Sequence, residues 1–131
     1  MARLHLSARR DDGTVTVTVA GELDVAAAPG LKSYLHKILA ADPGRIVINL
    51  SRVSFIDAAG LGALVALRNR AERQHTALLL ADVPAAMARV MKLLRLDDQF
   101  GYLTVTEGGH GARQAVNLAG WALALRKLRV G

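Results

Sequence analysis

Residues 53–69, which read VSFIDAAGLGALVALRN, decide the fold of this 131-residue chain. The stretch leaves an apolar strand, turns at Ile56-Asp57 and enters a helix whose first turns carry two alanines and two glycines. Asp57 stands directly before the helix, where a carboxylate can cap the free backbone N–H groups of Ala59 and Gly60. The sequence therefore predicts a strand, a short turn and a helix with a small-sided start.

The two sides of this helix differ in character. With about 100° per residue, the side expected to pack on the sheet carries Leu61, Leu64, Val65 and Ala71. The other side is smooth at its start and basic at its end, and carries Ala59, Gly62, Ala66, Arg70 and Arg73. A glycine inside a helix costs about 1 kcal/mol relative to alanine, so both glycines indicate a need for close approach. For Gly60, docking of a partner and packing on a neighbouring strand are equal alternatives, whereas for Gly62 we expect docking.

The chain before this stretch predicts a hairpin, a helix and a strand. Residues 4–8 alternate as a short strand, and residues 14–19 alternate β-branched polar and apolar side chains, which is typical of a strand buried on one face. We expect the two to pair antiparallel. Residues 27–41 have helical spacing, with Pro29 in the first turn, where its missing N–H costs little. Residues 45–50 form an apolar run typical of a strand covered on both faces.

The chain after this stretch continues the alternation of strands and helices. The central helix should extend to about Gln74, and residues 77–81 form a second apolar strand. A helix begins at Pro84. Its apolar side carries Met87, Val90, Met91 and Leu94. Residues 102–106 predict a last strand, and residues 112–128 a final helix.

Together these elements predict an α/β fold. We expect a mixed sheet of four to five strands, with an N-terminal hairpin and later strands parallel, and about four helices. The length fits a single domain over residues 1–131, with its core over residues 4–106. The sequence assigns no oligomeric state.

Composition and hydropathy predict a cytoplasmic chain that does not insert into a membrane. It holds no cysteine, which removes disulfides and thiolate metal sites and fits a reducing compartment. The longest uncharged apolar runs, residues 58–67 and 116–125, are ten residues each, well short of the roughly 20 that span a bilayer. The start does not resemble a signal peptide. We therefore expect a cytoplasmic protein without membrane insertion.

The net charge of +6 does not by itself indicate nucleic-acid binding. Seventeen Lys and Arg residues face eleven Asp and Glu, but the cations are spread over the predicted helices and a closing cluster. Aromatic residues make up 4% of the chain and are not interleaved with that cluster, so a stacking platform for single strands is poorly supported. We expect solvated basic faces and no direct contact with nucleic acid.

Catalytic and metal chemistry find little support. The four histidines are scattered without the i, i+4 spacing of metal ligands. Gly60-Leu61-Gly62 follows a strand as a dinucleotide loop would, but Val65 stands where a third small residue is needed. A capping role accounts for Asp57 without chemistry. We expect a protein that is not an enzyme and that uses no metal and no cofactor.

Three motifs, taken together, resemble the STAS domains of bacterial anti-sigma factor antagonists. They are Gly21-Glu22-Leu23-Asp24, then Ile48-Asn49-Leu50 leading to Phe55-Ile56-Asp57, and Gly60-Leu61-Gly62. The likeness runs in unbroken order over about residues 4–106. It implies a non-enzymatic switch protein that binds an anti-sigma factor, itself an ATP-dependent serine kinase, so that a sigma factor is released to RNA polymerase.

The sequence departs from that family at the residue that the kinase modifies. The family's motif is Asp-Ser/Thr-Ser/Thr-Gly, whereas this chain reads Asp57-Ala58-Ala59-Gly60, and the phosphoacceptor position falls on Ala59. A phosphate there would bring about −1.5 to −2 charges onto the docking face. Alanine instead resembles the unphosphorylated, binding-competent state. We therefore expect no phosphorylation at this position, and binding that is constitutive or regulated elsewhere.

The predicted partner-binding surface combines this helix start with the loop after the second strand. Its members are Asp24, Asp57, Ala58, Ala59, Gly60, Gly62, Ala66 and Asn69. Glu22 is a weaker member, and turn formation explains the nearest hydroxyls, Ser51 and Ser54. Two alternatives stay open: a STAS subunit of a membrane-transport complex with an ATPase as partner, and a STAS module that senses a nucleotide or lipid.

Overall fold

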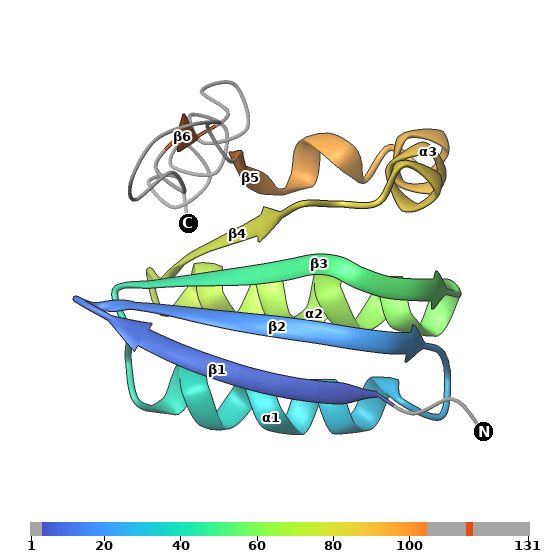
Figure 1. Ribbon diagram of the computed structural model, residues 1–131. Helices are drawn as coiled ribbons and strands as arrows, with labels where there is room; N and C mark the ends of the chain where they lie inside the picture. Colours follow the sequence, from blue (N-terminus) through green and yellow to red (C-terminus); the bar gives the residue numbers. More distant parts are fainter. Residues whose placement is uncertain (1–3, 105–114, 117–131) are drawn as a thin grey trace.

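One six-stranded sheet carries the fold in the computed structural model, which describes residues 4–104 and 115–116 (Figure 1). The strands, in their order across the sheet, are β1 (His5–Asp11), β2 (Thr14–Leu23), β3 (Arg45–Ile56), β4 (Ala77–Ala81), β5 (Gly101–Thr104) and β6 (Ala115–Val116). β1 is antiparallel to β2, β2 to β5 run parallel, and β6 is antiparallel to β5. The predicted fold class, a mixed sheet with an N-terminal hairpin and parallel later strands, is confirmed, although the sheet has six strands where four to five were predicted.

Two long helices lie side by side on one face of this sheet (Figure 1). The helices in the described part are α1 (Ala28–Ala40), α2 (Ala58–Arg73), α3 (Ala85–Leu93) and the 3-10 helix η1 (Asp97–Gln99). α1 and α2 each connect two parallel neighbouring strands, and right-handed crossovers in the same direction place both on the same face. None of the described helices is long and apolar enough to cross a membrane.

The main core lies between these helices and the sheet. Alternate residues of β2 are buried there, namely Val15, Val17 and Val19, while the threonines between them are half-buried on the other face. All of residues 46–50 are buried, because Ile46 and Ile48 face the helices while Val47 joins a second apolar cluster on the opposite face. The predictions of a one-sided β2 and a two-sided β3 are confirmed.

β3 runs six residues beyond the predicted end at Leu50. The strand continues to Ile56 because it keeps its pairing with β2, with register shifts between Thr18 and Ala20 and between Gly21 and Glu22. These irregularities add twist, as bulges do, while the pairing continues. The extension determines where α2 starts, because Asp57 follows the last paired residue.

The predicted apolar side of α3 is half right. Met87 and Met91 are buried, but Val90 is 40% and Leu94 56% exposed. α3 ends at Leu93, so Leu94 lies past its last turn and cannot continue the stripe. The i, i+4 methionine pair alone reaches the core.

The sequence predicts a final helix over residues 112–128. The structure describes two of these residues, and for both of them the prediction is wrong. Ala115 and Val116 pair with Thr104 and Leu103 as the short strand β6. An edge strand such as β5 presents unpaired backbone N–H and C=O groups, and pairing with them overrides a helical side-chain pattern. The rest of that prediction, and residues 105–106 of the predicted last strand, lie outside the described residues.

Candidate functional site

Asp57 joins the start of α2 to the loop before α1. Its Oδ1 accepts a hydrogen bond of 3.0 Å from the backbone N–H of Gly60, which confirms the predicted helix cap. Its Oδ2 accepts one of 3.1 Å from the N–H of Val25, and its own N–H donates to the carbonyl oxygen of Leu23 at 3.3 Å. One carboxylate therefore fixes two chain segments that are 32 residues apart.

Asp24 plays the matching part at the start of α1. Its Oδ1 accepts from the N–H of Ala27 at 2.9 Å, and its carbonyl oxygen accepts from Ala27 and Ala28 at 3.1 and 2.9 Å. These bonds close the turn through which the chain enters α1. Both carboxylates of the predicted surface therefore position backbone, and their contact with a partner stays a prediction.

Gly60 is enclosed by the strand ends beneath α2. A Cβ atom on it would lie 2.2 Å from the carbonyl oxygen of Leu23 and 2.9 Å from side-chain atoms of Leu23 and Ile56. Real Cβ atoms do not approach backbone oxygen so closely, so no other residue fits without moving the chain. Of the two alternatives for Gly60, the structure supports packing on the neighbouring strand.

Gly62 has the opposite surroundings. It is exposed, and a Cβ atom built on it would meet nothing within 4 Å. The fold therefore gives no steric reason for a glycine at this position, although it costs helix stability. Docking of a partner at Gly62, which the sequence predicts, stays a prediction.

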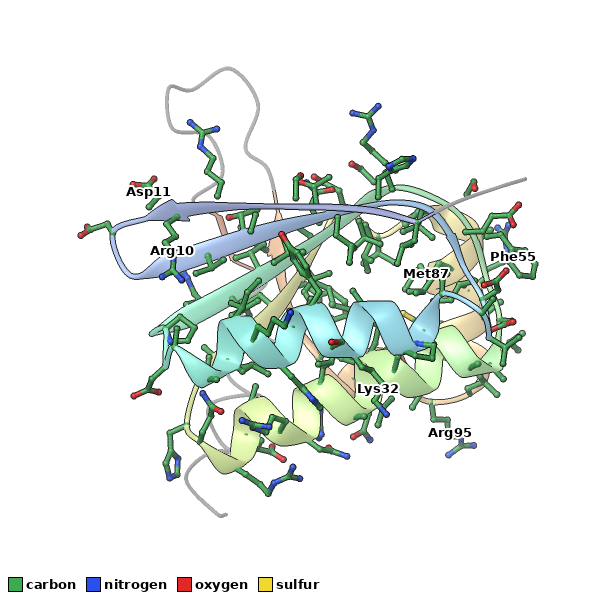
Figure 2. All side chains as sticks on the ribbon, turned by 90° about the horizontal axis from the view of Figure 1, so that it is seen from below. Arg10, Asp11, Lys32, Phe55, Met87 and Arg95 are labelled. Carbon is green, nitrogen blue, oxygen red and sulfur yellow. The ribbon has the colours of Figure 1, made fainter. Side chains whose placement is uncertain are left out.

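Gly62 opens onto a groove between α1 and α2 that the sequence did not predict. The groove has a volume of about 790 Å³. Its α2 wall consists of the small residues Ala59, Gly62 and Ala63. Its longer α1 wall includes Ala28, Lys32, Ser33, His36 and Lys37, and Val25 lies at its end. Figure 2 shows the two helices side by side in front of the sheet, with Lys32 on α1 where it borders α2.

The rest of the predicted surface is spread along the outer side of α2. Ala58 is exposed at the first helical position, and Ala59 is half-buried. Ala66 is half-buried and Asn69 exposed, one and two turns beyond Gly62 and outside the groove lining. The structure therefore brings Ala59 and Gly62 together in the groove, and leaves Ala66 and Asn69 on the helix surface beyond it.

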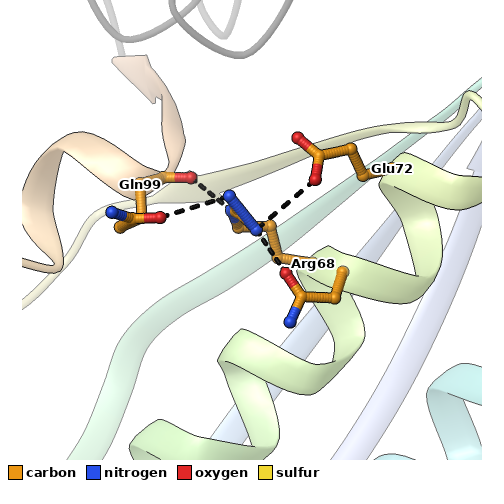
Figure 3. Close-up of polar contacts among 4 residues, drawn as sticks. Arg68, Glu72 and Gln99 are labelled. Carbon is orange, nitrogen blue, oxygen red and sulfur yellow. Dashed lines mark hydrogen bonds and ion pairs between the residues drawn. The ribbon is translucent and has the colours of Figure 1, made fainter. Parts of the chain in front are cut away.

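The far end of α2 is held by its own chain (Figure 3). Arg68 donates from Nε to the carbonyl oxygen of Gln99 at 2.6 Å and from Nη2 to its Oε1 at 3.2 Å. The same guanidinium pairs with Glu72 at 3.7 Å and donates to Oδ1 of Asn69. At the first residue of η1, Tyr102 donates to the carbonyl oxygen of Asp97. Burial, together with the Asp97 and Asp98 carboxylates, raises the pKa of Tyr102 to about 12. Part of the basic end of α2 thus serves the fold.

Two exposed apolar side chains flank Asp57, and sequence reasoning gave neither of them a role. Val25 is 70% and Phe55 50% exposed. Phe55 projects at the end of the molecule where α2 begins (Figure 2). In the sequence, each of these apolar residues stands close to a capping aspartate, which could have marked them as candidates. Their exposure to solvent depends on the three-dimensional fold and could not be predicted from the sequence.

The serines nearest to the alanine pair are engaged by the fold. The N–H and Oγ of Ser51 donate to Oδ1 of Asn49 at 2.9 and 2.7 Å, and Ser54 Oγ donates to the carbonyl oxygen of Gly21 at 3.3 Å. These bonds support the structural explanation for both hydroxyls.

Within the part of the chain that the structure describes, no three His, Asp or Glu side chains gather as metal ligands.

Comparison with known proteins gives one consistent result. The STAS domain family model matches residues 5–108 of this chain. The anti-sigma-B factor antagonist of Bacillus subtilis (strain 168) is 28% identical over 106 residues, which cover 81% of this chain and 96% of that protein. The crystal structure of an anti-sigma factor antagonist from Mycobacterium paratuberculosis matches with a TM-score of 0.69 at 28% identity, covering 76% of this chain and 85% of the other. A sulfate transporter family protein from Wolinella succinogenes shares the fold, with a TM-score of 0.62 at 20% identity over 92% of each chain.

Proposed function

The chain belongs to the STAS domain family, and we propose that it acts as an anti-sigma factor antagonist. In this proposal it binds an anti-sigma factor with serine kinase activity through the outer side of α2, and a sigma factor is released. The observation that carries the proposal is Gly62, a glycine with no steric role in the fold, at the accessible start of the helix that holds the family's phosphoacceptor position. The two relatives named as antagonists support the class of partner.

We further propose that binding is not switched at the usual position. Ala58 and Ala59 carry no hydroxyl, so a kinase partner has no acceptor there. The surface stays apolar where a phosphorylated homologue would present a dianion. The protein then acts as a constitutive antagonist or is controlled at another site.

The test is a pairwise calorimetric titration of the purified chain against each anti-sigma factor encoded in the same genome. We expect one of them to bind, and the bound chain to take up no phosphate at residues 58–59 when ATP is added. Absence of binding by every anti-sigma factor would remove the proposed function. Stoichiometric phosphorylation that weakens binding would remove the constitutive part alone.

Two matched variants locate the binding surface. Gly62→Glu places a charged side chain on the outer side of α2, where there is space for it, and should abolish binding while the chain stays folded. Ala88→Glu makes the same kind of change at an exposed position of α3 and should bind normally. Equal affinities for the two variants would exclude α2 from the interface.

Ala59→Ser tests the missing switch directly. A serine at this position restores the hydroxyl of the family's motif. We expect this variant to acquire phosphate from the bound kinase and then to lose affinity, because the added charge enters a face fitted to a neutral group. Its unphosphorylated form should bind like the natural chain.

A further inference from the structure

The groove between α1 and α2 has two unlike walls. The α2 wall is made of alanine and glycine, so a partner can approach its backbone closely. The α1 wall includes the lysines Lys32 and Lys37, with His36 one helical turn beyond Lys32. Val25, which is 70% exposed, adds an apolar contact at the end of the groove.

The charge of the groove has one sign. Its lining includes two lysines and no Asp or Glu. Within the described part of the chain, neither Lys32 nor Lys37 pairs with a carboxylate. Asp24 and Asp57, which stand close in sequence to the lining residues Val25 and Ala59, accept backbone hydrogen bonds at the helix starts. Asp42 lies beyond the other end of α1. The lining of the groove therefore carries positive charge that no ion pair within the described residues neutralises.

The form of the occupant follows from the walls. Both walls of the groove are helices, whose backbone N–H and C=O groups are hydrogen-bonded within the helix beyond the first turn. An extended strand would therefore find no backbone partners for its own hydrogen bonds. A helix brings its own backbone bonds and needs only side-chain contacts. Small residues on one wall allow the close end of the usual 8–10 Å spacing between helix axes.

We propose that the groove between α1 and α2 receives an acidic amphipathic helix of the partner protein. Apolar residues of that helix pack on Val25, Ala59 and Gly62, while its carboxylates face Lys32 and Lys37. The identification of the partner as an anti-sigma factor rests on the proposed function. The preference for an acidic helix follows from the shape and charge of the groove alone.

The first experiment needs no partner protein. The probe is a synthetic helical peptide of about 18 residues, roughly five turns, with Glu along one side and Leu and Ala along the other. We expect it to shift the backbone amide resonances of residues 30–40 and 59–63 in the isotope-labelled chain. A peptide with Lys in place of every Glu should cause no saturable shift.

A pair of charge reversals supplies the control. Lys32→Glu with Lys37→Glu should weaken binding of the acidic peptide at least about tenfold, because attraction across the groove becomes repulsion. Arg89→Glu with Lys92→Glu changes the net charge equally on α3, where both residues are exposed, and should leave the affinity unchanged. Equal losses in the two double variants, shifts confined to other surfaces, or no saturable binding up to about 1 mM would overturn the proposal.

The same variants separate this inference from the proposed function. If an anti-sigma factor binds and loses affinity with Gly62→Glu but not with the α1 double reversal, the proposed function holds and the acidic helix is wrong. If no anti-sigma factor binds while the acidic peptide still occupies the groove, the groove assignment holds and the antagonist function is wrong.

Discussion

The two sides of the first turns of α2 meet opposite demands. Gly60 faces inward, where a single Cβ atom would lie 2.2 Å from a backbone oxygen. Gly62, two residues later and so on the other side of the helix, faces space that the fold leaves empty. The same residue type is thus required by packing at one position and tolerated at a cost at the other. A small residue on a helix therefore indicates a binding interface only where no atoms of the same chain occupy the space beside it.

The same contrast extends along the helix. Its inner side is buried through Leu61, Leu64 and Leu67, and its far end is fastened to η1 through Arg68. Its outer side keeps a groove and an exposed glycine at the start. The fold is therefore held by one side of α2, and a partner can use the other without competing with internal contacts.

The largest expected effect is on the inner side. Gly60→Val should destabilise the folded state by about 3 kcal/mol or more, because the added atoms overlap backbone as well as side chains of Leu23 and Ile56. Chemical denaturation followed by circular dichroism measures this loss. Gly60→Ala should lose less, but still more than 1 kcal/mol, and a neutral result would show that the helix start can move away from β2.

Much of this inner side was predictable from sequence, because it depends on local pattern. The spacing of Leu61, Leu64 and Ala71 identified the buried side, and Asp57 identified the cap. The motifs around residues 21–24 and 55–62 led to the family that the STAS match over residues 5–108 establishes.

The outer side was predicted less completely, because it depends on contacts that are distant in sequence. The groove exists only where α1 lies beside α2, so neither helix pattern alone contains it. From the sequence alone, the lysines of the α1 wall are expected to lie on an ordinary solvent-exposed face of that helix. The exposure of Phe55 depends on the extension of β3, and the short strand β6 depends on the open edge of β5. Each of these is a result of tertiary placement.

The next effect concerns the far end of α2. Arg68→Met removes a guanidinium that holds two oxygens of Gln99, and we expect a loss of about 2 kcal/mol, since hydrogen bonds from charged groups contribute more than neutral ones. The ion pair with Glu72 adds little, because such pairs near the surface are weak. Glu72→Gln is the matched control and should change stability by less than about 0.5 kcal/mol. Partner binding should survive both changes.

A smaller loss of stability is expected at Asp57, which stands at the start of α2 between its inner and outer sides. Asp57→Ala removes the helix cap and the bond to Val25, and should cost about 1.5 kcal/mol. Asp57→Asn keeps an acceptor for the Gly60 N–H and should recover most of that stability. If the asparagine variant is stable but binds an anti-sigma factor weakly, the carboxylate itself contributes to the interface. If both variants bind normally, Asp57 serves the fold alone.

The smallest effect has the opposite sign and tests the comparison most directly. Gly62→Ala should stabilise the chain by about 1 kcal/mol, because alanine is the better helix former and its Cβ atom meets nothing within 4 Å. Thermal unfolding should therefore shift upward, while Gly60→Ala shifts it downward. In a binding titration, the added methyl group should weaken an occupant that approaches the glycine closely, and stability and affinity then change in opposite directions. A variant with higher stability and unchanged affinity would show that the outer side tolerates a methyl group, and the interface would then rest on Ala59 and the α1 wall.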